Sequence, residues 1–183
     1  MDLARITGAV WLLYFVTAIP GGALLARSRD VGIALSVVST IAYVAVTALL
    51  FALLEPVDRS TALVAAFVAL TGCALTAVAT VLQTAASTEL ADLGKRTVAI
   101  SFAFFGCFMV LTGMLIARST FLPQLFGGWF IVAGLAWATV LIPPVFRVLQ
   151  VGIVPFGGLA EVALMLWLLA RGIDVARWQV LLR

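Results

Sequence analysis

Histidine is absent from the 183-residue chain, and only two cysteines are present, Cys73 and Cys107. A chain without histidine lacks the commonest ligand of haem and zinc and the commonest general base near neutral pH. Both cysteines lie within apolar runs, where a thiol behaves as a small hydrophobic group. Glycine loops for phosphate and paired catalytic carboxylates are missing too. We therefore predict no catalytic residue, no metal ligand and no cofactor.

Charge is also scarce. The 11 Lys and Arg and the 8 Asp and Glu make up 10% of the chain and leave a formal net charge of +3, whereas about a quarter of the residues of a soluble domain are charged. This excludes a soluble globule, and the apolar bias excludes a disordered chain. The basic residues are scattered, so nucleic acid is not an expected partner. Anionic headgroups of membrane lipids suit them better.

Apolar residues make up 64% of the sequence and form six long runs. A bilayer core about 30 Å thick requires about 20 helical residues. Backbone groups in hydrocarbon must pair internally, and these runs are too long and continuous for barrel strands. We predict an all-α protein with a single domain, residues 1–183, which is an integral membrane bundle of six transmembrane helices. The expected spans are residues 6–26, 31–54, 61–86, 97–117, 124–145 and 151–170.

The connections between these runs are short, so neighbouring helices should pack antiparallel, with both termini on one side. Only the connection 87–96 is long enough to hold a helical turn of its own at the interface. Pro143 and Pro144 are expected to end the fifth helix. The tail, residues 171–183, suits either a short amphipathic helix on the headgroups or a frayed end.

The basic residues favour an orientation only narrowly, with six on the side of the termini and five on the other. The first group is Arg5, Arg59, Arg118, Arg171, Arg177 and Arg183. The second is Arg27, Arg29, Lys95, Arg96 and Arg147. By the positive-inside rule, this balance slightly favours cytoplasmic termini.

Two short strings recur at matching places in the two halves of the chain. Residues 24–28 (LLARS) and 115–119 (LIARS) end the first and fourth helices, and residues 53–59 and 141–147 end the second and fifth. Three helices per repeat would make the halves inverted in the membrane, as in many transporters. Because Leu, Ala and Arg are common at helix ends, a chance match is the other interpretation.

Glu161 is the carboxylate that lies well inside a span, between Arg147 and Arg171. A charge near the bilayer midplane costs about 3 kcal/mol on insertion scales. Glu161 should therefore face protein and either pair with a donor or stay protonated. Gly157 and Gly158 share its helix face and predict the close approach of another backbone. The carboxyl is either a site for a proton, a cation or a ligand amine, or a structural group bonded to a neighbouring helix.

Polar residues recur at steps of three and four in the first three helices, so each set shares one face. The sets are Thr7, Tyr14 and Gly21; Ser36, Ser39, Thr40, Tyr43 and Thr47; and Gly72, Thr76, Thr80, Gln83, Thr84 and Ser87. If these faces point inward, helices one, two, three and six enclose a modestly polar interior around Glu161. The candidate site is Glu161 with Tyr14, Tyr43, Thr80 and Gln83. Helix packing is the competing interpretation of the same faces.

Pro20 and Pro155 interrupt the first and last helices near the same membrane face. A proline removes a backbone donor, so the pair indicates either simple kinks or a site built on broken helices.

Several strings resemble a bacterial membrane family known as domain of unknown function 4386. They are residues 4–8 (ARITG), 54–59 (LEPVDR), 105–123 with Gly127, and 155–172 (PFGGLAEVALMLWLLARG), in which Glu161 matches an acidic position of the family's closing helix. The resemblance implies a protein of the bacterial cytoplasmic membrane and assigns no activity. Two features depart from the family. The connection between the first two helices is short, and Phe108 stands where relatives can show histidine.

We expect a protein without catalytic chemistry that binds or transports a small, mainly apolar molecule, with Glu161 as the buried polar site. The alternative is a non-catalytic partner or regulatory subunit of another protein, and either role allows a homo- or hetero-oligomer. A third interpretation is an enzyme acting on a lipid-borne substrate, for which Glu161 is the available base.

Overall fold

The computed structural model describes residues 3–25 and 27–181. These residues form seven α-helices and one short 3-10 helix, η1, and contain no strand. Ala26, which ends the first expected span, and Leu182 and Arg183 of the tail lie outside the described residues. The helices are α1 (Leu3–Leu24), α2 (Arg29–Leu54), α3 (Arg59–Gln83), α4 (Thr88–Arg118), α5 (Gln124–Ala138), η1 (Thr139–Leu141), α6 (Pro143–Ala170) and α7 (Val175–Leu181).

Six helical segments are long and apolar enough to cross a membrane. They are α1, α2, α3, α4, Gln124–Leu141, which joins α5 to η1, and Val151–Ala170 within α6. The predicted all-α fold with six spans is confirmed.

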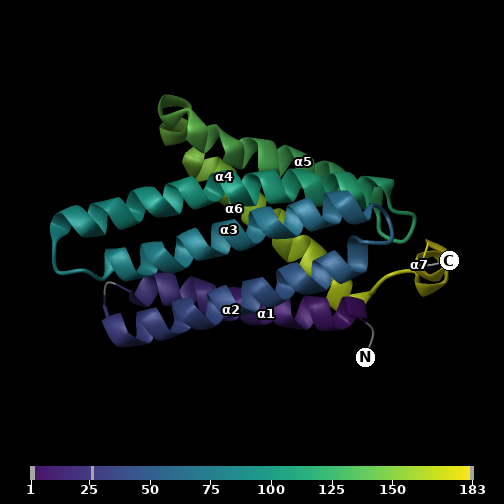
Figure 1. Ribbon diagram of the computed structural model, residues 1–183, viewed down its shortest axis with the longest axis horizontal. Coiled ribbons are helices and arrows are strands. Elements are labelled where there is room, and N and C mark those ends of the chain that lie inside the picture. Colours follow the sequence, from purple (N-terminus) through teal and green to yellow (C-terminus); the bar gives the residue numbers. More distant parts are fainter. Residues whose placement is uncertain (1–2, 26, 182–183) are drawn as a thin grey trace.

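Consecutive long helices run antiparallel, and the chain begins and ends at the same end of the bundle (Figure 1). The helix α6 crosses the others obliquely and packs mainly on α1 and α5. Each half of the chain contributes three of the six spans, but the inverted repeat stays a prediction.

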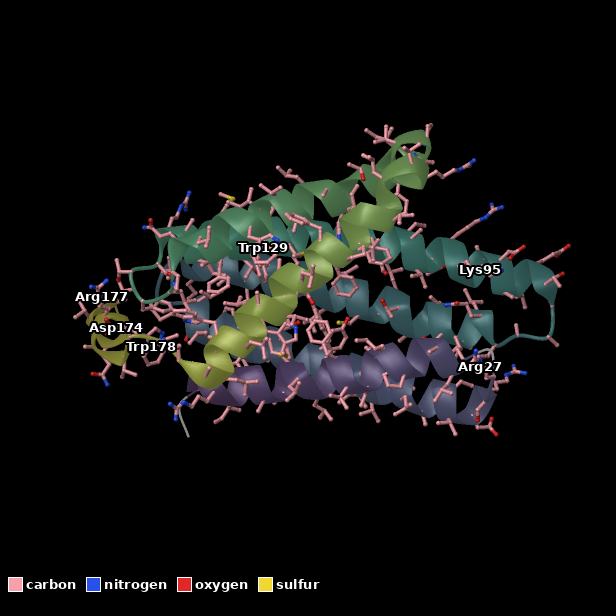
Figure 2. The ribbon with its side chains drawn as sticks, turned by 180° about the vertical axis from the view of Figure 1, so that it is seen from behind. Arg27, Lys95, Trp129, Asp174, Arg177 and Trp178 are labelled. Carbon is pink, nitrogen blue, oxygen red and sulfur yellow. The ribbon has the colours of Figure 1, made fainter. Side chains whose placement is uncertain are left out.

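The tail forms the short helix α7, which lies at the end of the bundle where α2 meets α3 and α4 meets α5. The indole Nε1 of Trp178 donates to the carbonyl oxygen of Leu53 at 3.0 Å. The guanidinium of Arg177 donates to the carbonyl oxygen of Thr120 at 3.1 Å. Figure 2 shows Asp174, Arg177 and Trp178 at this end and Arg27 and Lys95 at the opposite one. That α7 lies on lipid headgroups stays a prediction.

The connection between α3 and α4 is shorter than expected, because most of residues 87–96 belongs to α4. The Ser87 hydroxyl accepts a hydrogen bond from the backbone N–H of Leu90 at 3.5 Å and caps a helix that starts at Thr88. The 31 residues of α4 extend about 46 Å at 1.5 Å per residue. The bilayer core is only about 30 Å thick, so the charged first turns of α4 project from it.

The expected boundary between the fifth and sixth helices is wrong. The helix α5 ends at Ala138 and continues into η1, and Pro143 and Pro144 open α6 instead of ending α5. A proline suits the first turn of a helix, because the N–H it lacks would have no acceptor within the helix there. The sixth helix thus starts at residue 143, ahead of the span Val151–Ala170, which has the bounds expected from the sequence.

Glycines let α4 and α5 pack backbone against backbone. A Cβ on Gly106 would lie 2.7 Å from the carbonyl oxygen of Gly134, and one on Gly113 would lie 2.7 Å from that of Gly127. Two glycine pairs, spaced seven residues apart on each helix, hold this contact. Most of these glycines belong to the string that resembles the family.

The neighbour of Gly157 is an indole and not the backbone that the sequence predicted. A Cβ on Gly157 would overlap the ring of Trp137, whose Nε1 donates to the carbonyl oxygen of Ile153 at 3.1 Å. Nothing lies within 4 Å of a Cβ on Gly158. The tryptophan of α5 therefore fills the space beside the first glycine of the pair.

Neither proline inside a helix breaks it. Pro20 lies within α1 and Pro155 within α6, and both helices continue through them. The idea of a site built on broken helices is therefore wrong.

Candidate functional site

Glu161 of α6 is buried in the interior of the bundle, beside Tyr43 of α2. Its side chain is 3% exposed, and its Oε1 accepts a hydrogen bond from the hydroxyl of Tyr43 at 2.8 Å. A buried carboxyl needs such a partner, because an unsatisfied polar group in a low-dielectric interior is costly. The bond joins two helices whose residues lie 118 positions apart in the sequence.

Trp11 of α1 completes the surroundings of the carboxyl. Its side chain is fully buried beside Glu161. Its indole Nε1 has no hydrogen-bond partner among the described residues. The carboxyl thus has one donor in use, the Tyr43 hydroxyl, and a second donor close by.

Three aromatic rings pack edge to face next to this acid. The ring of Tyr14 lies 4.7 Å from that of Tyr43 at an interplanar angle of 62°. The ring of Phe105 lies 5.2 Å from that of Tyr43 at an interplanar angle of 77°. The three rings come from α1, α2 and α4, so Tyr43 stands at the centre of a row that joins three helices.

A cavity of about 300 Å³ opens on this row, between α1, α2, α3 and α4. Tyr14, Tyr43, Thr80 and Gln83 all line it, and Glu161 lies behind Tyr43, outside the lining. The other lining residues are Ala18, Gly22, Leu25, Ser36, Ser39, Thr40, Cys73, Thr76, Val98 and Phe105.

The fourth wall of this cavity differs from the expected one, because α4 supplies Val98 and Phe105 where α6 was expected. The contribution of α6 is Glu161, which reaches the cavity through the Tyr43 hydroxyl. Sequence reasoning missed Cys73, Val98 and Phe105, because apolar side chains inside apolar runs carry no signal that separates a cavity wall from packing.

Most hydroxyl groups of the cavity wall donate hydrogen bonds to backbone carbonyls of their own helices. Thr40 donates to the carbonyl oxygen of Ser36, Thr76 to that of Gly72 and Thr80 to that of Thr76, over 2.8 to 3.0 Å. Such bonds leave the lone pairs of the hydroxyl oxygens available as acceptors. The Tyr14 hydroxyl makes no hydrogen bond within the part of the chain that the structure describes.

A second cavity, of about 240 Å³, adjoins the first at the end of the bundle opposite the termini. Its walls are Gly22, Leu25, Gln83, Ala91 and Lys95, and the first three of these also line the larger cavity. The smaller cavity thus shares walls with the larger one at the Lys95 end of the bundle.

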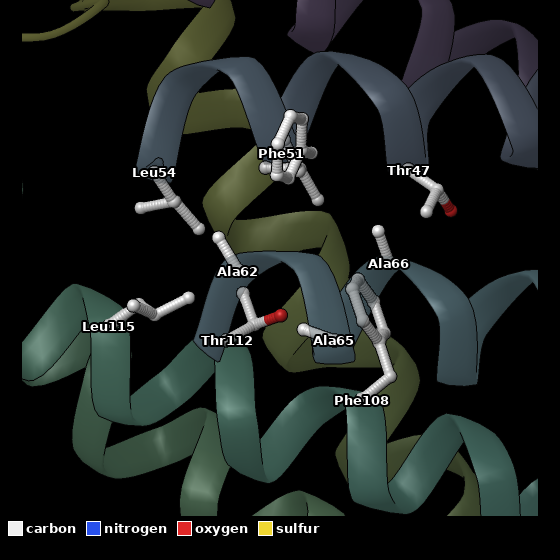
Figure 3. Close-up of a pocket in the computed structure, with 10 residues that line it drawn as sticks. Thr47, Phe51, Leu54, Ala62, Ala65, Ala66, Phe108, Thr112 and Leu115 are labelled. Atoms are coloured by element: carbon white, nitrogen blue, oxygen red, sulfur yellow. The ribbon is translucent and has the colours of Figure 1, made fainter. Parts of the chain in front are cut away.

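A third space, of about 10 Å³, lies between α2, α3 and α4 (Figure 3). It is large enough for about one water molecule. Phe108 lines it, and the ring of Phe108 packs at 6.3 Å from that of Tyr43. Phe108 is thus a neighbour of the tyrosine that is bonded to Glu161.

Six apolar spans around a buried acid define a multi-pass integral membrane protein. The chain belongs to the family described as Domain of unknown function (DUF4386), whose pattern matches residues 30–172. The resemblance seen in the sequence is thereby confirmed. No curated protein and no solved structure matches the chain.

Proposed function

We propose that this protein binds a small, mainly apolar molecule in the cavity lined by α1, α2, α3 and α4, as a step in moving it across the membrane. It has no catalytic chemistry of its own in this proposal. One observation carries the proposal. A cavity of about 300 Å³ has Tyr14, Tyr43, Thr80 and Gln83 in its wall, and the buried Glu161 is bonded to that wall through Tyr43.

The size and lining of the cavity support this function. Sites for small molecules measure about 300 to 1,000 Å³ and combine apolar walls with a few placed polar groups. Protein interiors otherwise leave few voids larger than a water molecule. If the polar faces of α1, α2 and α3 served packing alone, they would be expected to close on one another.

The adjoining space at the Lys95 end supports access from the membrane side opposite the termini. The family resemblance and the narrow excess of basic residues favour the bacterial cytoplasmic membrane with cytoplasmic termini. In that orientation, the site opens away from the cytoplasm.

Binding of 1-hexanol to the full chain in phosphatidylcholine nanodiscs tests the proposal, with protein-free nanodiscs as the blank. The variant Ala18→Phe places a ring in the cavity. Ile19→Phe is the matched control, because Ile19 is 69% exposed on the lipid-facing side of the same helix. We expect wild type and Ile19→Phe to retain hexanol and Ala18→Phe to lose it. Equal retention by Ala18→Phe and wild type contradicts the proposal.

The alternative role, as a membrane partner of another protein, makes a different prediction. Purification in mild detergent would then recover a second subunit in stoichiometric amount. Repeated recovery of this chain alone, with hexanol retained in the cavity, favours the binding function.

A further inference from the structure

Although the hydroxyls of Tyr14 and Ser36 donate to no group in the described part of the chain, the cavity wall offers more free acceptors than free donors. The hydroxyls of Ser39, Thr40, Thr76 and Thr80 donate to backbone carbonyls of their own helices. The amide nitrogen of Gln83 donates to the carbonyl oxygen of Ala79 at 3.3 Å. The Oε1 of Gln83 accepts no hydrogen bond within the described residues. A ligand that offers N–H or O–H donors therefore fits this wall better than one that offers only acceptors.

The electrostatics favour a positive charge on those donors. Glu161 forms no ion pair within the described part of the chain, where the ion pairs join Lys95 to Asp92, Arg118 to Asp58 and Arg177 to Asp174. The Tyr43 hydroxyl donates a hydrogen bond to Glu161, so the phenol oxygen is polarised toward accepting a further hydrogen bond. A cation at that oxygen would lie one hydrogen bond away from the buried acid.

The aromatic residues of the cavity wall also favour a cation. Tyr14, Tyr43 and Phe105 all line the cavity, and their rings pack edge to face on one another. The face of an aromatic ring is electron-rich and attracts an ammonium group. No basic side chain is among the lining residues. Lys95, which lines the smaller adjoining cavity, forms an ion pair with Asp92 at 2.8 Å.

We propose that the ligand is a lipophilic ammonium ion, with an apolar body and a protonated amine that lies against Tyr14 and Tyr43. This inference rests on the proposed function and narrows its ligand class. The acceptor-rich wall, the acid behind Tyr43 and the three aromatic residues of the lining all favour a cation with donors. A neutral molecule gains only hydrogen bonds with the wall, and an anion is repelled by the carboxylate of Glu161. The apolar body extends past Val98 and Leu25 toward the Lys95 end.

Three six-carbon probes of equal length separate these cases: hexylammonium, 1-hexanol and hexanoate. Their binding to the full chain is measured at pH 7 in phosphatidylcholine nanodiscs, which carry no net charge to concentrate cations. Binding to Ala18→Phe is subtracted, and Ile19→Phe is the control. We expect hexylammonium to bind at least about tenfold more tightly than hexanol, with no specific binding of hexanoate.

The outcomes distinguish this inference from the function on which it rests. If hexanol or hexanoate binds as tightly as hexylammonium, the cavity binds small apolar molecules but the ammonium proposal is overturned. If none of the three binds above the Ala18→Phe background, the proposed function fails as well.

A variant of the acid tests the source of the selectivity. Glu161→Gln keeps the shape of the side chain and an oxygen that accepts from Tyr43, but it removes the carboxylate. We expect the ratio of hexylammonium to hexanol affinity to fall by at least about tenfold, in protein that elutes as a single species. An unchanged ratio overturns the role of Glu161. If the variant does not fold, the wild-type series with three probes still decides the ligand class.

Discussion

The hydroxyl of Tyr43 on α2 donates to Oε1 of Glu161 on α6 at 2.8 Å. Tyr43 lines the cavity and Glu161 does not, so the acid is linked to the cavity wall through this bond. The tyrosine thus has two roles. It satisfies a buried carboxyl, and in the proposed function its polarised oxygen accepts a hydrogen bond from the ligand.

The first prediction concerns this bond. Tyr43→Phe leaves the buried carboxyl without its donor and should lower the free energy of unfolding by about 1 to 3 kcal/mol. The double variant Tyr43→Phe with Glu161→Leu should recover most of that loss, because replacing both partners by apolar groups removes the unsatisfied atom. Unfolding in detergent measures both effects. A single variant as stable as wild type would show that the bond contributes nothing.

A second prediction uses two neighbouring glycines of α5 as a matched pair. A Cβ on Gly127 would lie 2.6 Å from the backbone nitrogen of Ala117, whereas nothing lies within 4 Å of one on Gly128. Gly127→Ala should therefore force α4 and α5 apart and destabilise the bundle by about 1 to 3 kcal/mol. Gly128→Ala should change the unfolding midpoint little. Equal midpoints for the two variants would show that close packing of α4 on α5 is dispensable.

The third prediction concerns pH and the start of α3. The carboxylate of Asp58 accepts hydrogen bonds from the backbone N–H and the hydroxyl of Thr61, at 3.1 and 3.0 Å. These bonds hold the pKa of Asp58 below its ordinary value of 3.8. A lowered pKa means that the stabilisation is fully present above the ordinary value and is lost as the pH falls through the lower, folded-state value.

Asp58→Ala should therefore unfold at a lower temperature than wild type at pH 7, and the difference should shrink below about pH 4. Thermal unfolding followed by circular dichroism across that range gives the comparison. A difference that stays constant down to pH 2 would mean that the carboxylate charge does not contribute.

The sequence alone predicts much of this molecule, for a physical reason. Hydrocarbon demands long apolar helices, so composition predicts six spans, and steps of three and four place Tyr43 with Ser39 and Thr40 on one face. These patterns say which residues share a face, but not which helix lies opposite it. The bond from Tyr43 to Glu161, the wall formed by Phe105 and the indole beside Gly157 all depend on that second choice.

The helix ends show the same limit. Pro143 and Pro144 are equally compatible with ending α5 and with opening α6, because proline is tolerated both after the end of a helix and in its first turn. The choice depends on how α5, η1 and α6 pack at the end of the bundle, which local sequence does not encode.

The central claim, that Glu161 serves a ligand and not only packing, is tested most directly by Glu161→Leu. Hexylammonium binding and thermal unfolding are measured on the same nanodisc preparation, beside wild type. The account predicts that folded Glu161→Leu protein loses at least about nine-tenths of its affinity for hexylammonium. A variant that unfolds at a higher temperature than wild type and still binds hexylammonium equally well would contradict it.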